Sequence, residues 1–415
     1  MNLWRHPHFR LNWMGRMVSL FGSDISGLAI PVTALTLLNA NPAQMGLLQG
    51  AQGVAFFVLS LPVGVWVDRL PRRPILIISD IARALLLGLI PLCIWSGHLS
   101  MGFLIAIGVL TGAFTVCFQV AERAFLPSIV TREELVSANS HLSASEAIAE
   151  ISGPALAGTL VQWLTAPFAI VLDSLSYLFS ALCFWNIKVA EKSPETPETE
   201  GWATLLEGIR YIRRHAILRS LVLMMASLSF FGNFFASLYL LFLVRDLHIS
   251  PGVVGVLVGL GGIGKLVSAS VNTKMTRRFG VGKVILVGLV LGSWDGAVIY
   301  ALHGSIWFCT LVLGFMQLVG DIPTGWFYMN VMSLRQSVIP TRLQGRVHAG
   351  MGFLIEGLAP IGAVVGGLLG VWIGLRLTLL MTMCGPLIAL VFLLASPILH
   401  LRELPESGEE HERTP

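Results

Sequence analysis

Charged side chains lie inside long apolar stretches of this 415-residue chain, where each of them needs either a partner or a function. A charged group at the centre of a bilayer costs about 2.5–3.5 kcal/mol on insertion scales, so such positions point to binding, proton transfer or ion pairing. Low-dielectric surroundings favour the neutral form of a carboxyl group, which can then take up a proton on one side of a membrane and release it on the other. The candidates are Asp24, Glu146, Glu150, Asp173, Lys265, Asp295, Asp321 and Glu356.

The stretches that carry these charges are long enough to cross a bilayer. Hydrophobic residues make up 55% of the chain and charged residues only 12%, and the mean hydropathy is +0.78. Soluble domains carry about 25% charged residues, and a spanning helix needs about 20 mainly apolar residues. The sequence therefore predicts an all-α membrane protein with twelve spans, near residues 11–38, 45–67, 74–95, 101–121, 142–163, 166–187, 217–244, 251–271, 282–302, 305–330, 347–371 and 376–400.

A polar interval divides the spans into two groups of six, which predicts four regions. Residues 1–187 would form an N-terminal six-helix bundle, 188–216 a cytoplasmic linker, 217–400 a C-terminal six-helix bundle and 401–415 a cytoplasmic tail. Apolar residues at helical spacing beside three arginines predict an amphipathic helix on the membrane surface near the end of the linker, with a plain solvated linker as the alternative. With the N-terminus inside, nearly all of the 27 Lys and Arg residues fall on that side, so both termini are predicted to be cytoplasmic.

The loop between the second and third spans carries the strongest local motif, formed by Gly64, Asp68, Arg69, Arg72 and Arg73. An aspartate at the C-terminal end of a helix meets the negative end of the helix dipole, so Asp68 needs a positive partner such as Arg72 or the N-terminus of a neighbouring helix. A contact of this kind at one membrane face would form a gate, closed in one conformation and broken in another. The alternative is that the arginines serve only as topology signals.

Further patterns occur at equivalent places in the two groups of spans, as expected for an internal repeat. A doubled arginine precedes the ninth span as it precedes the third. The fifth and eleventh spans each place a glutamate four residues before a proline: Glu150 and Pro154 in one, Glu356 and Pro360 in the other. Ahead of the fifth span, the spacing of Thr131 and Glu134 predicts a capping box at the start of a helix.

Residues 64–73 resemble the Gly-x-x-x-Asp-Arg-x-x-Arg-Arg signature of the major facilitator superfamily. Residues 79–86, with Asp80 and Arg83, are similar to the start of the third span in one branch of that family, the macrolide-efflux proteins and the enterobactin exporter. Residues 123–139 and 335–347 resemble the same branch. In the fifth span, three residues resemble the antiporter motif of drug exporters: Gly153, Pro154 and Gly158. An ordinary kinked packing helix is the alternative there.

This resemblance implies the major facilitator fold, two pseudo-symmetric six-helix bundles in which the first, fourth, seventh and tenth spans line the substrate cavity. On that basis Asp24 and Asp321 rank first as proton-binding or substrate-binding residues, with Gln119 and Asn233 as polar neighbours. Structural pairing of Asp24 with Arg16 or with another helix is the alternative.

Other charged positions are ranked lower. Glu150 and Glu356 are binding candidates that could equally be structural acids of the repeat, and Asp173 and Asp295 are expected to be structural. Many proton-coupled drug exporters carry an arginine within the fourth span, whereas residues 102–121 contain no basic residue. The coupling mechanism of those relatives therefore does not transfer directly.

Taken together, these features predict a secondary active transporter that exports a small amphipathic compound, either a drug or a metabolite, by alternating access coupled to proton influx. A siderophore or secreted-metabolite exporter is the alternative within the class, and a non-transporting sensor or scaffold is the alternative outside it. No enzyme is expected, because no catalytic constellation is found. The glycine-rich run at 259–266 lacks the Ser or Thr that a phosphate loop needs after its lysine, there is no His-Glu-x-x-His zinc pair, and Gly320-Asp321 lacks the neighbouring glycine of intramembrane aspartyl proteases. We expect no cofactor, no metal and no nucleic acid. The expected partners are the substrate, protons and the lipid of the cytoplasmic membrane, with the chain acting as a monomer.

Overall fold

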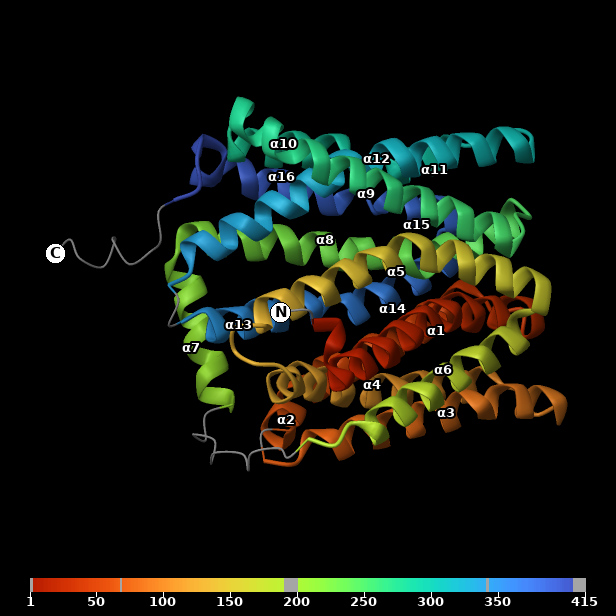
Figure 1. Ribbon diagram of the computed structural model, residues 1–415. Helices are drawn as coiled ribbons and strands as arrows, with labels where there is room; N and C mark the ends of the chain where they lie inside the picture. Colours follow the sequence, from red (N-terminus) through yellow and green to blue (C-terminus); the bar gives the residue numbers. More distant parts are fainter. Residues whose placement is uncertain (1–2, 68, 190–200, 341–342, 406–415) are drawn as a thin grey trace. The chain divides into compact units, whose positions relative to one another are not determined.

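The computed structural model describes residues 3–67, 69–189, 201–340 and 343–405, and every regular element in these ranges is helical (Figure 1). The motif residue Asp68, the polar part of the predicted linker and the end of the predicted tail lie outside the described residues. By its internal contacts the chain divides into two compact units. Unit 1 comprises residues 1–44, 51–199 and 249–259, and unit 2 comprises residues 45–50, 200–248 and 260–415.

The six helices that supply unit 1 correspond to the first six predicted spans, although several of them are longer than predicted. A short 3-10 turn, η1 (Leu3–Arg5), precedes them. They are α1 (Pro7–Leu37), α2 (Pro42–Val67), α3 (Arg72–Trp95), α4 (Met101–Ile129), α5 (Leu135–Leu164) and α6 (Ala166–Asn186).

The helices that supply unit 2 are more often interrupted. They are α7 (Gly201–Arg214), α8 (Ala216–Leu241) with a π-helical turn η2 (Phe242–Asp246), α9 (Pro251–Phe279), α10 (Val281–Leu291), α11 (Asp295–Ala301), α12 (Ile306–Val338), α13 (Gln344–Glu356), α14 (Leu358–Trp372), α15 (Leu375–Met381), α16 (Cys384–Leu394) and the 3-10 turn η4 (Pro397–His400). The predicted spans at 282–302, 347–371 and 376–400 are thus each divided into two helices, and the last ends at Leu394 because Pro397 opens a separate turn.

Ten helices or helix pairs in the described part of the chain are long and apolar enough to cross a membrane. They cover every predicted span except the second and the fifth, where α2 and α5 lie. A count of twelve spans therefore stays a prediction. Exposed tryptophans mark several helix ends, as expected at the boundary of a bilayer: Trp95 of α3, Trp163 of α5, Trp307 of α12 and Trp372 of α14.

The same capping arrangement opens the fourth span and its counterpart, the tenth. The Ser100 hydroxyl accepts a hydrogen bond from the Phe103 backbone N–H at 3.3 Å, and Ser305 does the same for Phe308 at 3.3 Å. A serine at this position satisfies one of the free donors of a helix N-terminus. Local sequence therefore fixes where α4 and α12 begin, in support of the predicted repeat.

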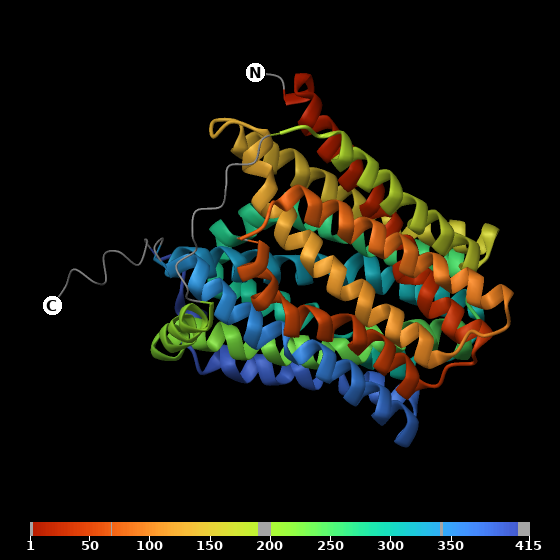
Figure 2. The ribbon, with the colours of Figure 1, turned by 90° about the horizontal axis from the view of Figure 1, so that it is seen from below.

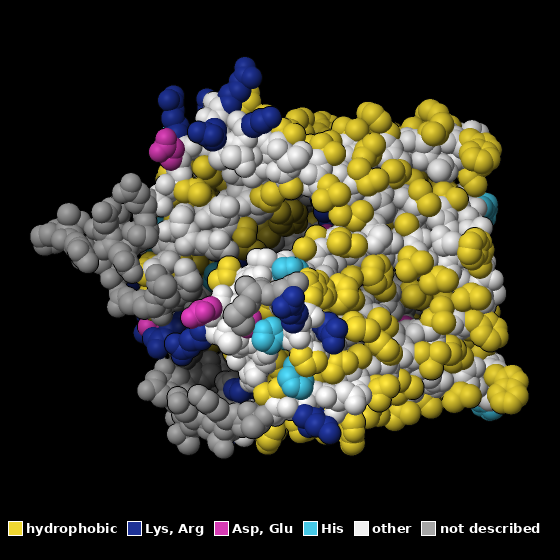
Figure 3. All heavy atoms as spheres, viewed as in Figure 1, with side chains coloured by type: hydrophobic (Ala, Val, Ile, Leu, Met, Phe, Trp, Pro, Cys, Tyr) yellow, Lys and Arg dark blue, Asp and Glu magenta, His cyan; other side chains and the backbone are white. Residues whose placement is uncertain are grey.

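Each unit has its own apolar core. In unit 1, α6 packs along α1 and α3 (Figure 2), and its Phe184 meets the rings of Phe118 and Phe125 edge-on at 5.7 and 6.2 Å. In unit 2, α8 packs along α14 and α16, and Leu218 and Leu221 of α8 belong to a buried cluster with residues of α10, α12, α13 and α16. Hydrophobic side chains cover most of the face drawn in Figure 3, while Lys and Arg gather at helix ends, as expected for helices whose flanks meet lipid.

The amphipathic helix expected in the linker is α7, which crosses the direction of α8 (Figure 1). Its apolar side does not simply face lipid: Ile212 is buried in a cluster with Val347 and Met351 of α13. Glu207 forms an ion pair with Arg346 at 2.5 Å. The predicted surface helix α7 therefore also has a packing role, because its apolar side and Glu207 contact the first turns of α13.

Candidate functional site

A cavity of about 230 Å³ lies among α1, α2, α3, α4 and α6 of unit 1, and we call it the unit 1 cavity. Its wall is rich in hydroxyl, amide and carboxylate groups: Ser23, Ser26, Gln52, Thr111, Thr115, Gln119, Asp173 and Tyr177. Polar groups are expensive at this depth in a membrane protein, so their collection around one cavity indicates a site for a polar ligand or ion.

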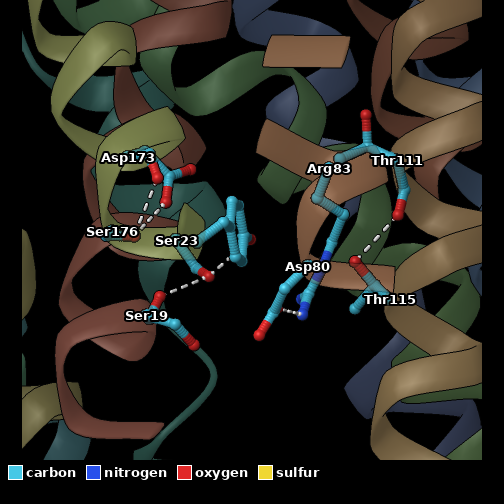
Figure 4. Close-up of polar contacts among 9 residues, drawn as sticks. Ser19, Ser23, Asp80, Arg83, Thr111, Thr115, Asp173 and Ser176 are labelled. Atoms are coloured by element: carbon cyan, nitrogen blue, oxygen red, sulfur yellow. Dashed lines mark hydrogen bonds and ion pairs between the residues drawn. The ribbon is translucent and has the colours of Figure 1, made fainter. Parts of the chain in front are cut away.

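An arginine held between two aromatic rings braces this part of unit 1. The Arg83 guanidinium carbon lies 4.1 Å from the ring centre of Tyr177 and 4.4 Å from that of Phe118. Arg83 also forms an ion pair with Asp80, one turn earlier on α3, and both side chains are buried (Figure 4). Cation–π contacts and a close carboxylate offset the cost of burying the charge. Tyr177 is fixed in turn by a 2.9 Å hydrogen bond between its hydroxyl and that of Ser23.

Asp173 of α6 has an exposed fraction of 0% and lines the same cavity. One of its oxygens, Oδ1, accepts a hydrogen bond from the Ser176 hydroxyl at 3.0 Å. The other, Oδ2, and the buried hydroxyl of Ser26 on α1 make no hydrogen bond of ordinary geometry among the described residues, although Ser26 lies near enough to interact with the Asp173 carboxylate. The room for this carboxylate depends on Gly22, since a side-chain carbon there would collide with Asp173 Oδ1. A purely structural role, as expected from the sequence, would account for the hydrogen-bonded Oδ1 of Asp173 but not for its buried Oδ2.

A second charged cluster links three helices of unit 1. Arg16 of α1 pairs with both Glu122 of α4 and Glu146 of α5. The pairing of Asp24 with Arg16, considered from the sequence, is therefore wrong. The two residues are eight positions apart, which separates them by about 12 Å along the helix. Sequence reasoning missed Glu122 because α4 runs to Ile129, well past the predicted end of the fourth span, and the longer helix also contains Arg123.

Asp24 lies instead against the antiporter-like motif of α5. A side-chain carbon on Gly153 would collide with the Asp24 carboxylate, so the glycine makes room for the acid. Glu150, one turn earlier on α5, is near enough to act on Asp24 electrostatically. The motif also packs closely at Gly158, where a Cβ would lie 2.6 Å from the Pro251 carbonyl oxygen, within unit 1. The motif thus combines an acid pocket with a close helix contact.

The basic loop motif is only partly described. Gly64 lies in α2, Arg69 lies in the turn that follows, and Arg72 is the first residue of α3. The Arg73 guanidinium donates hydrogen bonds to the backbone carbonyls of Phe184 at 3.0 Å and Trp185 at 2.5 Å. A cation at the carbonyl end of a helix is favourable, so Arg73 fixes the start of α3 to the end of α6.

Thr131 and Glu134 form half of the predicted capping box. The Glu134 carboxylate accepts hydrogen bonds from the Thr131 backbone N–H at 3.2 Å and the Thr131 hydroxyl at 3.0 Å, but α5 begins only at Leu135. His6 Nε2 lies 3.0 Å from the same carboxylate. The N–H and hydroxyl of Thr131 and the neighbouring His6 lower the pKa of Glu134 below its ordinary value.

Unit 2 contains a corresponding cavity of about 200 Å³, the unit 2 cavity, among α8, α10, α11, α12 and α16. These helices are the counterparts in chain order of α1, α3, α4 and α6. Two helix interruptions face it, at residues 292–294 and 382–383, and irregular backbone at membrane depth is tolerated where it lines a cavity. Its polar wall consists of Ser293, Asp295, Asp321, Thr324, Tyr328 and Thr382.

The remaining sequence candidates are placed as follows. Asp321 packs against α9, because a Cβ added to Gly264 of α9 would lie 3.1 Å from the Cβ of Asp321. The Asn233 amide donates to the Ser229 carbonyl one turn earlier in α8, at 2.8 Å. Glu356 is exposed at the last position of α13, beside the interruption at Gly357. Among the described residues, no group of three or more His, Cys, Asp and Glu could hold a metal ion.

An all-helical fold with polar cavities inside lipid-compatible bundles is typical of membrane transporters, and comparison with known proteins agrees. Residues 13–354 match the Major Facilitator Superfamily, and the chain belongs to this family of transporters, which are not enzymes. It is 25% identical over 405 residues, 94% of either chain, to the uncharacterized MFS-type transporter YfiS of Bacillus subtilis. It is 23% identical over 350 residues to the enterobactin exporter EntS of Citrobacter koseri, covering 83% of this chain and 80% of the relative.

Solved structures show the same fold. An inward-facing bacterial homologue of the iron transporter ferroportin matches with a TM-score of 0.76 at 18% identity, covering 95% of this chain and 99% of that one. The nucleoside transporter NupG matches with a TM-score of 0.67 at 14% identity, with 95% and 99% covered. The predicted major facilitator fold is therefore confirmed.

Proposed function

We propose that the protein is a secondary active transporter that exports a small amphipathic compound, a drug or a metabolite, by alternating access coupled to proton influx. The observation that carries this proposal is the pocket for Asp24 at Gly153: an acid of α1 fills the space left by the glycine of an antiporter-like motif, with Glu150 nearby. A carboxyl group in such surroundings can bind a proton in one conformation and lose it in another. Likeness to enterobactin exporters over most of the chain supports export as the direction.

In this proposal Asp24 carries the coupled proton in unit 1, and Asp321 is its counterpart in unit 2. Gln119 on the wall of the unit 1 cavity and Asn233 on α8 supply hydrogen bonds to the substrate, while Glu150 and Glu356 tune the charge around them. Both termini are proposed to be cytoplasmic, because Lys and Arg are concentrated in the termini and loops assigned to that side. The chain is proposed to act as a monomer, with one substrate path in each copy.

The loop motif acts as a gate on the cytoplasmic face in this account. Asp68 engages a positive partner while the face is closed and releases it as the face opens. Arg73 keeps the start of α3 on α6 in both states, because its partners are carbonyls of unit 1 itself. Asp68→Asn should slow transport while leaving membrane insertion intact, and unchanged flux at equal protein levels would remove the gate from the account.

A siderophore or another secreted metabolite is the alternative substrate class, and likeness to the enterobactin exporter favours it specifically. A sensor or scaffold that moves nothing is the alternative outside transport. The polar cavity in each unit disfavours that alternative, because buried polar groups cost stability and a scaffold has no use for them.

Everted membrane vesicles would test the proposal, because export then appears as uptake. Vesicles with the protein and vesicles without it would be given amphipathic dyes and a catecholate siderophore, with and without an acid interior. We expect uptake of at least one compound that requires the acid interior and is lost in Asp24→Asn. Uptake of the siderophore alone would select the alternative substrate class. Protein-dependent uptake with the same pH dependence in Asp24→Asn would remove that residue as the proton carrier.

A further inference from the structure

The charge of Asp173 is not balanced by the side chains around it. Arg83 is the cation that acts on Asp173 electrostatically, but its guanidinium is already paired with Asp80 and enclosed by two rings. Asp24, the other charged neighbour, is itself an acid. A buried carboxylate without a positive partner is costly, so either a proton or a bound cation must neutralise it.

The geometry around Asp173 is suited to an ion. The Asp173 and Ser26 side chains come from different helices, line the same cavity and lie near enough to each other to interact. Asp173 Oδ2 and Ser26 Oγ nevertheless make no hydrogen bond of ordinary geometry in the described part of the chain. Ser26 is 5% exposed, so neither atom can be satisfied at the protein surface. The cavity of about 230 Å³ offers further oxygen atoms from Thr115 and Gln119. Oxygen-only surroundings suit hard cations and ammonium groups, whereas transition metals prefer imidazole and thiolate.

We propose that the unit 1 cavity binds a monovalent cation, with Asp173 Oδ2 as the charged ligand and Ser26 Oγ as a neutral one. A single carboxylate balances one positive charge, which favours a monovalent ion over a divalent one that would need more carboxylates. The same chemistry is met by an alkali-metal ion with its water and by a compact ammonium group of a transported compound. The site does not depend on the direction or the coupling of transport proposed above.

Thermal unfolding of the purified full chain in detergent would test this site without any transport measurement. The midpoint would be measured in sodium chloride, in methylammonium chloride and in N-methylglucamine chloride, at equal ionic strength and pH. A ligand that binds only the folded state raises the midpoint in proportion to the logarithm of its concentration. We expect a rise of several degrees in one of the first two salts over the third, lost in Asp173→Asn. The matched control is Asp246→Asn, which removes an exposed acid of η2 and should keep the rise.

The two test salts separate the two sources of the charge, because a rise in sodium alone indicates an alkali ion and a rise in methylammonium alone indicates an amine. Equal midpoints in all three salts, or a rise retained in Asp173→Asn, would overturn the site. A midpoint that depends on pH but on no cation would overturn it as well, since a proton alone would then neutralise Asp173. Should Asp173→Asn fail to fold, Ser26→Ala decides: we expect a several-fold higher half-saturating concentration, and an unchanged value contradicts the site.

Discussion

The unit 1 and unit 2 cavities occupy equivalent places in the two repeats but are built by different means. In unit 1 the helices are continuous, and buried charges and rings brace the wall through Arg83, Asp80 and Tyr177. In unit 2 the wall contains two helix interruptions, and glycines bring backbones together, as where Gly288 meets α12. The same fold can thus hold a polar cavity open by ion pairing or by close backbone packing, and each means has its own vulnerability.

The largest effect is expected from removing the charge at the centre of the unit 1 brace. Arg83→Gln leaves Asp80 buried without its cation, which should cost about 3–5 kcal/mol. The thermal midpoint in detergent, followed by loss of the monodisperse peak, would measure the change. The double variant Asp80→Asn/Arg83→Gln removes both charges and should recover much of the stability. An Arg83→Gln protein as stable as the original would show that charge does not brace this cavity.

A smaller loss of stability is expected in unit 2 when a methyl group is added where two helices are in close contact. A Cβ on Gly288 would lie 2.7 Å from the Pro323 carbonyl oxygen and 2.8 Å from the Phe327 amide nitrogen, both backbone atoms of α12. Gly288→Ala should therefore lower stability by about 1–3 kcal/mol. Gly352→Ala in α13 is the control, because no atom lies within 4 Å of its Cβ position. Similar midpoints for the two variants would mean that close backbone contact does not hold the unit 2 cavity.

The smallest effect on stability is expected from Glu134, at the edge of unit 1, and it should depend on pH. The pKa of Glu134 is lowered by the N–H and hydroxyl of Thr131 and by His6, so its ionised form is favoured in the folded protein. Its contribution should be fully present above the ordinary pKa of a glutamate and should be lost as pH falls through the lowered value. The difference in midpoint between the original protein and Glu134→Gln should shrink over that range. A difference that stays constant down to the lowest pH tolerated would contradict this role.

Hydropathy and loop charge predicted most of the fold because both are properties of continuous stretches of sequence. The existence of most spans and of the amphipathic α7 follows from hydropathy and spacing, and serine caps fix the starts of α4 and α12. The interruptions in unit 2 were not predicted from hydropathy, because short breaks such as Gly292-Ser293 do not end an apolar stretch that is long enough to span. At this break the Thr324 hydroxyl of α12 donates a hydrogen bond to the Gly292 carbonyl, a contact that hydropathy does not show.

The site was predicted less well because its partners come from different helices. Spacing could not show that Arg16 meets Glu122 and not Asp24, or that Gly153 faces Asp24. Asp173 ranked low because the family resemblance places the substrate cavity in other spans. Only the packing of Asp173 near Ser26 and Gly22 shows that its Oδ2 atom lacks an ordinary hydrogen bond. An acid next to serines in an apolar helix was the available signal.

Proton movement during transport tests the central claim most directly. Proteoliposomes would enclose a pH-sensitive dye, and a substrate found with everted vesicles would be added outside while its uptake is followed. The account predicts that the lumen becomes more alkaline in proportion to the substrate that enters, and that Asp24→Asn abolishes this change. Full uptake with no change of internal pH would contradict proton-coupled export.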